Sequence, residues 1–202
     1  MRLLILLAVL SGLPFASLAD ERDWQSMAER HDIELSDFAF HTRETLPSIR
    51  MTVYTLGTPR HDEHGQISNA VMLLHGTGGN GRSLLRPGFG DELFGPGQPL
   101  DIRENYIISP DNLGHGDSSK PSDGLRADFP RYDFDDMVLA QYRMLTEGLG
   151  IQQLGLIIGT SMGCMHNFAW GIDYPGFIRR FVSLACNAIE IAGRNPLHMW
   201  AF

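Results

Sequence analysis

The sequence has few cysteines, no excess of basic residues and, beyond its first twenty positions, no long apolar run. Two cysteines among 202 residues cannot form the disulfide framework of a small secreted fold. With 24 acidic and 16 basic residues, the formal net charge of −8 offers no positive surface to a phosphate backbone. Crossing a bilayer takes an apolar stretch of about 18 residues. Nucleic-acid binding and a membrane-spanning body are therefore not expected.

Residues 1–19 form the one markedly apolar segment. Arg2 supplies a positive start, residues 3–10 are apolar, and small residues precede the end of the segment at Ala19. This pattern is typical of a secretory signal peptide. Its apolar core is too short for a membrane anchor. We therefore expect a periplasmic or secreted protein.

The rest of the chain has the composition of one globular domain, with 43% hydrophobic and 20% charged residues overall. We expect residues 20–36 to form a loosely attached lead-in and residues 37–202 to form the domain. Export would place Cys164 and Cys186 where a disulfide can persist. Both cysteines fall in segments predicted to be buried, where a free thiol behaves as a small apolar group, so we expect them to be unpaired.

Strands and helices are expected to alternate along the chain. Alternating apolar and polar residues predict antiparallel strands at 37–42 and 49–56, joined by a turn at Pro47. The long segment 77–99, rich in glycine and proline, is expected to be functional or to carry a short helix. Apolar runs predict buried strands at 70–74, 106–109, 154–158 and 178–185, and amphipathic patterns predict helices at 135–148 and 162–174. This order is typical of an α/β protein with a mainly parallel sheet.

A Gly-x-Ser-x-Gly motif, residues 159–163, stands between an expected strand and an expected helix. In such a context the serine occupies a strained turn that lifts its hydroxyl above the sheet, which makes Ser161 a candidate nucleophile. Gly159 and Gly163 are expected because a Cβ would collide with backbone in so sharp a turn. The N–H of Met162, at the helix N-terminus, is a candidate donor to an oxyanion. A serine that only caps the helix is the alternative.

The loop after the strand at 70–74 is rich in glycine and begins with His75. Its backbone, including Gly76 and Gly78, can bend N–H groups toward a substrate carbonyl, and the N–H of Thr77 is the expected second oxyanion donor. A phosphate-binding loop is excluded, because the lysine and the glycine spacing of such loops are missing.

These motifs resemble the α/β-hydrolase fold, and more narrowly the branch that contains homoserine O-acetyltransferases. The resemblance rests on His75-Gly76, on Gly-Pro-Gly-Gln-Pro-Leu-Asp at 95–101, on Asp-Asn-Leu-Gly-His-Gly-Asp-Ser at 111–118 and on Gly-Thr-Ser-Met-Gly at 159–163. It extends over residues 37–192. It implies a three-layer α/β sandwich with a mostly parallel sheet, and a serine, an aspartate and a histidine that act together in that chain order.

The family places its catalytic aspartate and histidine after later strands. Here Phe202 follows shortly after the strand expected at 178–185. We therefore expect a domain that is incomplete at its C-terminal end, without the last strands, the last helices and the catalytic histidine.

No histidine of the chain is expected to act as the missing base. His166 lies on the helix after the motif, and His198 belongs to a segment that resembles the start of a lid. His75 and His115 occupy loop positions for which the resemblance implies a structural role. Asp111 could pair with His115 as acid and base, but we expect it to tie down its loop.

Other polar residues are expected to be solvated. Asp173 and Glu190 do not stand where they would orient a histidine. The pair His61 and His64 has no third ligand nearby, so no metal site is expected there.

The sequence predicts an exported serine hydrolase of the esterase type that needs no cofactor and acts on a small ester or acyl substrate. We expect little activity from this chain alone, because serine without a base is a weak nucleophile at neutral pH. One alternative is an acyltransferase similar to homoserine O-acetyltransferase, and another is a non-catalytic gene fragment.

Overall fold

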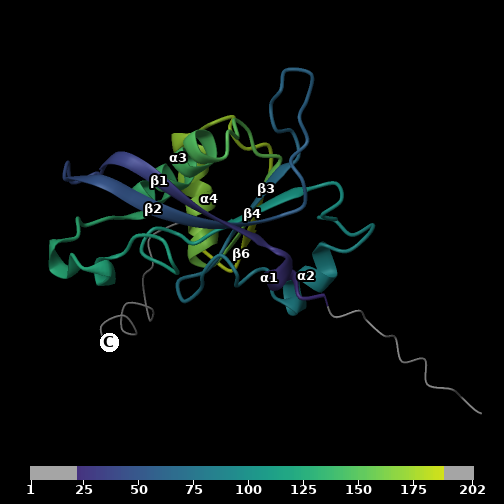
Figure 1. Cartoon of the computed structure of the whole chain (residues 1–202), viewed down its shortest axis with the longest axis horizontal. Coiled ribbons are helices and arrows are strands. Elements are labelled where there is room, and N and C mark those ends of the chain that lie inside the picture. The colour runs from purple at the N-terminus through teal and green to yellow at the C-terminus, as the bar shows by residue number, and fades with distance from the viewer. Residues whose placement is uncertain (1–21, 189–202) are drawn as a thin grey trace, which may run out of the picture.

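Residues 22–188 are described by a computed structural model, in which one six-stranded sheet forms the centre (Figure 1). The strand order across the sheet is β1-β2-β4-β3-β5-β6. The strands are β1 (Glu29–Ala39), β2 (Thr45–Leu56), β3 (Ala70–Leu74), β4 (Tyr106–Pro110), β5 (Leu156–Thr160) and β6 (Phe181–Leu184). The predicted signal peptide, residues 1–19, lies outside the described residues.

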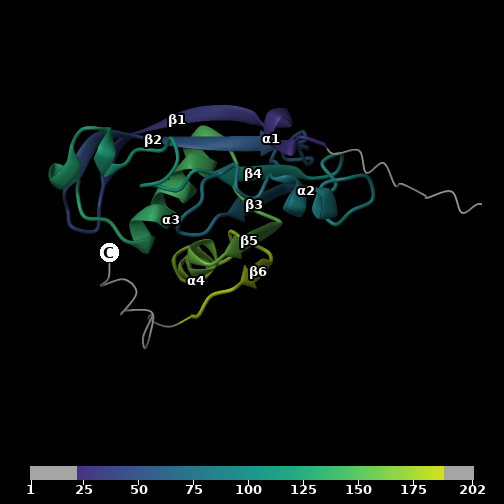
Figure 2. The same cartoon turned by 90° about the horizontal axis from the view of Figure 1, so that it is seen from below.

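Four main helices accompany the sheet, and Figure 2 shows α4 beside β5 and β6. They are α1 (Trp24–Met27), α2 (Pro87–Leu93), α3 (Phe134–Arg143), which continues into the π-helical turn η3 (Met144–Gly148), and α4 (Met162–Asp173); two short 3-10 turns, η1 (Pro121–Asp123) and η2 (Arg126–Asp128), precede α3. The helix α3 begins at a capping box, in which the Asp133 carboxylate accepts from the N–H groups of Asp135 and Asp136. The presence of α2 confirms that segment 77–99 carries its own short helix.

The pairing of the strands confirms the predicted class of fold. The first pairs, β1 with β2 and β2 with β4, are antiparallel, whereas β4, β3, β5 and β6 run parallel. In the parallel part, Val71 lies opposite Leu156, and Ile157 lies opposite Phe181. Parallel neighbours need crossover connections, which the helices between them supply.

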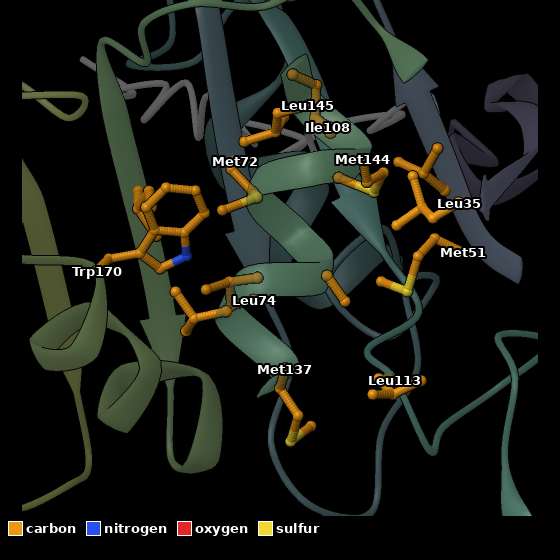
Figure 3. Packing of buried hydrophobic residues seen from close by; sticks show 14 of the residues in the cluster. Leu35, Met51, Met72, Leu74, Ile108, Leu113, Met137, Met144, Leu145 and Trp170 are labelled. Atoms are coloured by element: carbon orange, nitrogen blue, oxygen red, sulfur yellow. The ribbon is translucent and has the colours of Figure 1, made fainter. Parts of the chain in front are cut away.

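Apolar cores lie on both faces of the sheet, because successive side chains of a strand point to opposite sides. In β3, Met72 and Leu74 join the cluster that includes residues of α3 and α4, while Val71 and Leu73 join the cluster that includes residues of α1 and α2. Figure 3 shows part of the first cluster, including Trp170 of α4. The sheet with its two covered faces gives the predicted three layers.

The lead-in predicted for residues 20–36 is not loosely attached. β1 already begins at Glu29, and Trp24 is only 2% exposed. The indole Nε1 of Trp24 donates to Asp91 at 2.6 Å. The prediction of a strand at 37–42 located only the end of β1, because β1 lies at the edge of the sheet and most of its side chains face solvent, which leaves its sequence largely polar.

The hairpin between β1 and β2 also turns earlier than predicted. The N–H of Arg43 donates to the Phe40 carbonyl at 2.8 Å, and Pro47 lies within β2 rather than in the turn. The strand tolerates this proline because the register skips it, passing from Ser36 opposite Ser48 to Phe38 opposite Leu46.

Cys164 and Cys186 form a disulfide, which corrects the prediction of two free thiols. Their Cα atoms are 6.0 Å apart, a usual separation for a disulfide, although 22 positions separate them in the sequence. They meet because Cys164 lies in the first turn of α4 and Cys186 follows β6, whose end pairs with the end of β5. Burial was predicted correctly for Cys164, which is fully buried.

The strand β6 forms the edge of the sheet opposite β1, and it is the least covered strand of the parallel part. Phe181, Val182 and Leu184 are each about two-fifths exposed, at 41%, 38% and 43%. Ile172 of α4 continues this apolar surface at 77% exposure. None of the helices between residues 22 and 188 has the length and hydrophobicity of a bilayer-spanning segment.

Candidate active site

The turn between β5 and α4 presents Ser161 at the carboxyl edge of the sheet. Ser161 is exposed and has φ 52° and ψ −116°, a conformation that residues other than glycine seldom adopt. Its N–H donates to the Leu184 carbonyl of β6 at 2.9 Å, and its carbonyl accepts from Cys164 N–H at 3.0 Å. Ser161 stands at the N-cap position of α4, but its side chain makes no capping hydrogen bond. A purely capping role is therefore excluded.

Glycines make this turn possible. A Cβ on Gly159 would lie 2.2 Å from the Gly163 carbonyl oxygen, and a Cβ on Gly163 would lie 2.3 Å from the Leu74 carbonyl oxygen. Real side chains do not approach backbone so closely, so both positions require glycine. The steric reason predicted for Gly159 and Gly163 is confirmed.

The glycine-rich loop after β3 lies directly against Ser161. A Cβ on Gly76 would lie 3.2 Å from the Ser161 Cβ and 3.7 Å from its Oγ. Thr77 follows at an exposed position, and Met162 begins α4. The N–H groups of Thr77 and Met162 remain the predicted oxyanion donors. A Cβ on Gly78 would meet no atom within 4 Å, so packing does not demand glycine there.

The buried side chain of His75 hydrogen-bonds to this loop. It is 1% exposed, and its Nε2 accepts from the Asn112 N–H at 3.2 Å. Its Nδ1 therefore carries the proton, which it donates to the Gly76 carbonyl at 2.8 Å. Burial lowers the pKa of His75, so the ring stays neutral. These two hydrogen bonds join the loop after β3 to the segment that follows β4.

The loop after β4 is tied to the loop after β3, as predicted for Asp111. The buried Asp111 carboxylate accepts from the N–H of Gly81 at 2.6 Å and from the N–H of Asp117 at 2.7 Å. His115 donates from Nε2 to the Thr77 carbonyl at 3.0 Å. Both side chains bridge loops, and neither is hydrogen-bonded to the other or to Ser161 in the part of the chain described.

A buried polar network under the turn was not predicted. Gln141 of α3 donates from Nε2 to Asn112 Oδ1 at 2.7 Å and to His166 Nδ1 at 3.0 Å. Its Oε1 accepts from the indole Nε1 of Trp170 at 2.7 Å. All four residues are buried. A glutamine among the apolar positions of an amphipathic helix was the available signal, because a buried amide needs partners.

His166 does not serve Ser161 as a base. Burial lowers the pKa of His166 to about 3. Its Nδ1 is occupied by Gln141, and its Nε2 finds no partner among the described residues. Asp173 is exposed at the end of α4, whereas Glu190 and His198 lie outside the described residues.

A second group of titratable residues joins the hairpin of β1 and β2 to α3. Potential ligand atoms of His41, Asp133 and Asp136 lie within 4.8 Å of one another. The Asp136 carboxylate already accepts from the His41 N–H at 2.8 Å and from the Asp133 N–H at 3.1 Å. Its contact of 2.6 Å with His41 Nδ1 makes the group a clamp between two elements. The pair considered from the sequence, His61 and His64, is exposed.

This clamp predicts a pH-dependent stability. The hydrogen bond to Asp136 raises the pKa of His41. The stabilisation is complete below the ordinary histidine pKa of about 6.5 and is lost as the pH rises through the higher folded-state value. We expect His41→Gln to lower the urea midpoint at pH 5.5 and to change it little at pH 9. His61→Gln, on an exposed loop, is the control. An equal loss at both pH values would contradict the clamp.

The chain belongs to the α/β hydrolase fold family, whose model matches residues 69–201. This match includes the loop after β3, the turn at Ser161 and the helix α4. The parallel strands and the exposed serine turn described above agree with that family.

Within the family, the chain is similar to homoserine acyltransferases and to esterases. It is 31% identical over 194 residues to the homoserine O-acetyltransferase of Thermobifida fusca, covering 89% of this chain and 50% of that protein. It is 34% identical over 157 residues to the homoserine O-succinyltransferase of Marinobacter nauticus, covering 70% and 40%. Among solved structures, the acetyl esterase MekB is 25% identical with a TM-score of 0.74, covering 88% and 50%.

The chain therefore spans half or less of the length of these relatives. The relatives named above are two homoserine acyltransferases and one acetyl esterase, which all act on acyl groups.

Proposed function

We propose that this chain carries the nucleophile of a serine hydrolase that transfers an acyl group from a small ester to water. The observation that supports it is the exposed Ser161, held at positive φ between β5 and α4 with Gly76 beside its hydroxyl. The hydroxyl oxygen attacks the ester carbonyl, and the resulting oxyanion accepts from the N–H groups of Met162 and Thr77. The alcohol leaves with the proton taken from Ser161, and water then releases the acid.

The proton acceptor is not found near Ser161 in the described part of the chain. His75 and His166 are buried, neutral and engaged in other hydrogen bonds, and His115 is bound to the Thr77 carbonyl. A positioned general base contributes about 10²–10⁴-fold to the rate. The proposal therefore assigns the base to residues outside 22–188.

Export belongs to the same proposal. The signal-like segment 1–19 motivates it, and the disulfide between Cys164 and Cys186 supports it, because disulfides persist mainly in oxidising compartments. Fusion of residues 1–24 to a reporter that is active only after export would test this part separately.

The nucleophile is tested by acylation rather than by turnover. The full chain is incubated with p-nitrophenyl acetate, with and without imidazole as a soluble base, and acetylated peptides are located by mass spectrometry. We expect acetylation at Ser161 that imidazole accelerates, and none at this position in Ser161→Ala. Modification at other residues only would reject Ser161 as the nucleophile. Rapid hydrolysis without imidazole, abolished in Ser161→Ala, would show instead that the chain holds its own base.

Transfer to an amino-acid hydroxyl is the second candidate, and the similarity to the Thermobifida fusca homoserine O-acetyltransferase favours it. The two functions differ only in the acceptor that resolves the acyl-enzyme. Acetylated protein is mixed with homoserine in water, and O-acetylhomoserine is measured against free acetate. Faster formation of the ester would favour the transferase.

A further inference from the structure

The side chain of Gln141 fixes the orientation of every polar group around it. The Trp170 indole N–H can only donate, so the Gln141 oxygen must face Trp170 and its NH₂ must face the other two partners. Asn112 then has to present Oδ1 to Gln141, and His166 has to present an unprotonated Nδ1. The proton of the neutral His166 ring is consequently on Nε2.

The network reaches the nucleophile from two sides. On one side, His166 and Trp170 belong to α4, whose first turn follows Ser161. On the other side, Asn112 donates from its backbone N–H to His75.

The second path ends at the glycine-rich loop. His75 donates to the Gly76 carbonyl, which also accepts from the Gly79 N–H at 2.9 Å. Gly76 in turn packs on the Ser161 side chain. One carboxamide therefore connects the loop after β3, the loop after β4 and the helix α4.

We propose that Gln141 is a positioning residue, which sets the tautomer of His166 and holds the glycine-rich loop against Ser161. This positioning role affects catalysis only if Ser161 is the nucleophile, so it rests on the proposed function. Gln141 does not contact the reacting atoms and acts through Asn112, His75 and α4. An apolar side chain at this position would leave three buried polar atoms without a partner, a loss that packing cannot replace.

The first test uses Gln141→Glu, which keeps size and shape. A carboxylate still accepts from Trp170, but it can no longer donate to His166. We expect the ¹⁵N spectrum of the full chain to show His166 protonated at Nε2 in the wild type and at Nδ1 in Gln141→Glu, with His75 protonated at Nδ1 in the wild type. A role limited to filling space would leave the His166 tautomer unchanged, and that result would overturn the proposal.

The second test follows the consequence at the site. Backbone hydrogen exchange is measured in Gln141→Leu for the amides of Gly79 and Cys164, which bond to the carbonyls of Gly76 and Ser161. We expect both to exchange about tenfold faster, a change of about 1.4 kcal/mol in local opening. Gln152→Leu, at an exposed position, is the matched control and should leave both amides unchanged.

Unchanged exchange of both amides in a folded Gln141→Leu would also overturn the proposal. If Gln141→Leu does not fold, the tautomer of His166 in Gln141→Glu alone decides whether the proposal holds. Neither readout requires catalysis, so the positioning role can hold even if Ser161 is not acylated. Conversely, acylation of Ser161 with an unaltered His166 tautomer would reject only Gln141.

Discussion

The variant Gly163→Ala is expected to lose about 3 kcal/mol of stability, at the upper end of the range for overpacking. The added methyl group would lie 2.3 Å from the carbonyl oxygen and 2.6 Å from the carbonyl carbon of Leu74. Both atoms are backbone of the central strand β3, so relief requires α4 to move away from the sheet. The urea midpoint and the circular dichroism of the folded state measure the effect.

The matched control is Gly88→Ala in α2, where a Cβ would meet no atom within 4 Å. Alanine has a higher helix propensity than glycine, by up to about 1 kcal/mol, so this variant should be neutral or slightly more stable. Equal midpoints for the two variants would mean that α4 does not pack on β3 as closely as described.

Loss of the disulfide is expected to cost a similar amount. Cys186→Ser removes a link that closes a loop of 22 residues, and the chain-entropy relation gives about 3 kcal/mol for a loop of this size. The effect should fall mainly on β6, since Cys186 follows directly after this strand. Denaturant unfolding, together with hydrogen exchange resolved along the chain, measures both the size and the location.

Treatment with a reductant distinguishes the loss of the disulfide from the effect of the serine side chain in Cys186→Ser. Wild type treated with a reductant should unfold at the midpoint of Cys186→Ser, and the variant itself should not respond to the reductant. A wild-type midpoint that is insensitive to reduction would contradict a stabilising disulfide.

Much of the fold could be predicted because its signals are local. The continuous apolar runs of β3 and β4 predicted buried strands, and the Gly-x-Ser-x-Gly motif with Gly159 and Gly163 predicted the tight turn around Ser161. Residues 29–36 of β1 were assigned to the lead-in because an edge strand with one solvent-exposed face is mostly polar, and its sequence alone does not show the pairing with β2.

The features that the sequence did not predict depend on long-range contacts. Cys164 and Cys186 pair because α4 lies beside the end of β6, and the spacing of the two cysteines in the sequence does not predict this contact. Gln141 gains its role only when α3 packs beside α4 and brings Trp170 and His166 to it. The disulfide and the Gln141 network both depend on how the helices pack on the sheet, and hydrophobic periodicity does not predict that packing.

The edge strand β6 also supports the turn that holds Ser161, because the N–H of Ser161 donates to the carbonyl of Leu184. The unusual backbone angles of the serine thus rely on the least protected segment of the parallel sheet. Fraying of that one strand would relax the turn while most of the molecule stayed folded. The proposed reactivity of Ser161 should therefore follow the local opening equilibrium of β6, and mild denaturant should abolish it before global unfolding begins.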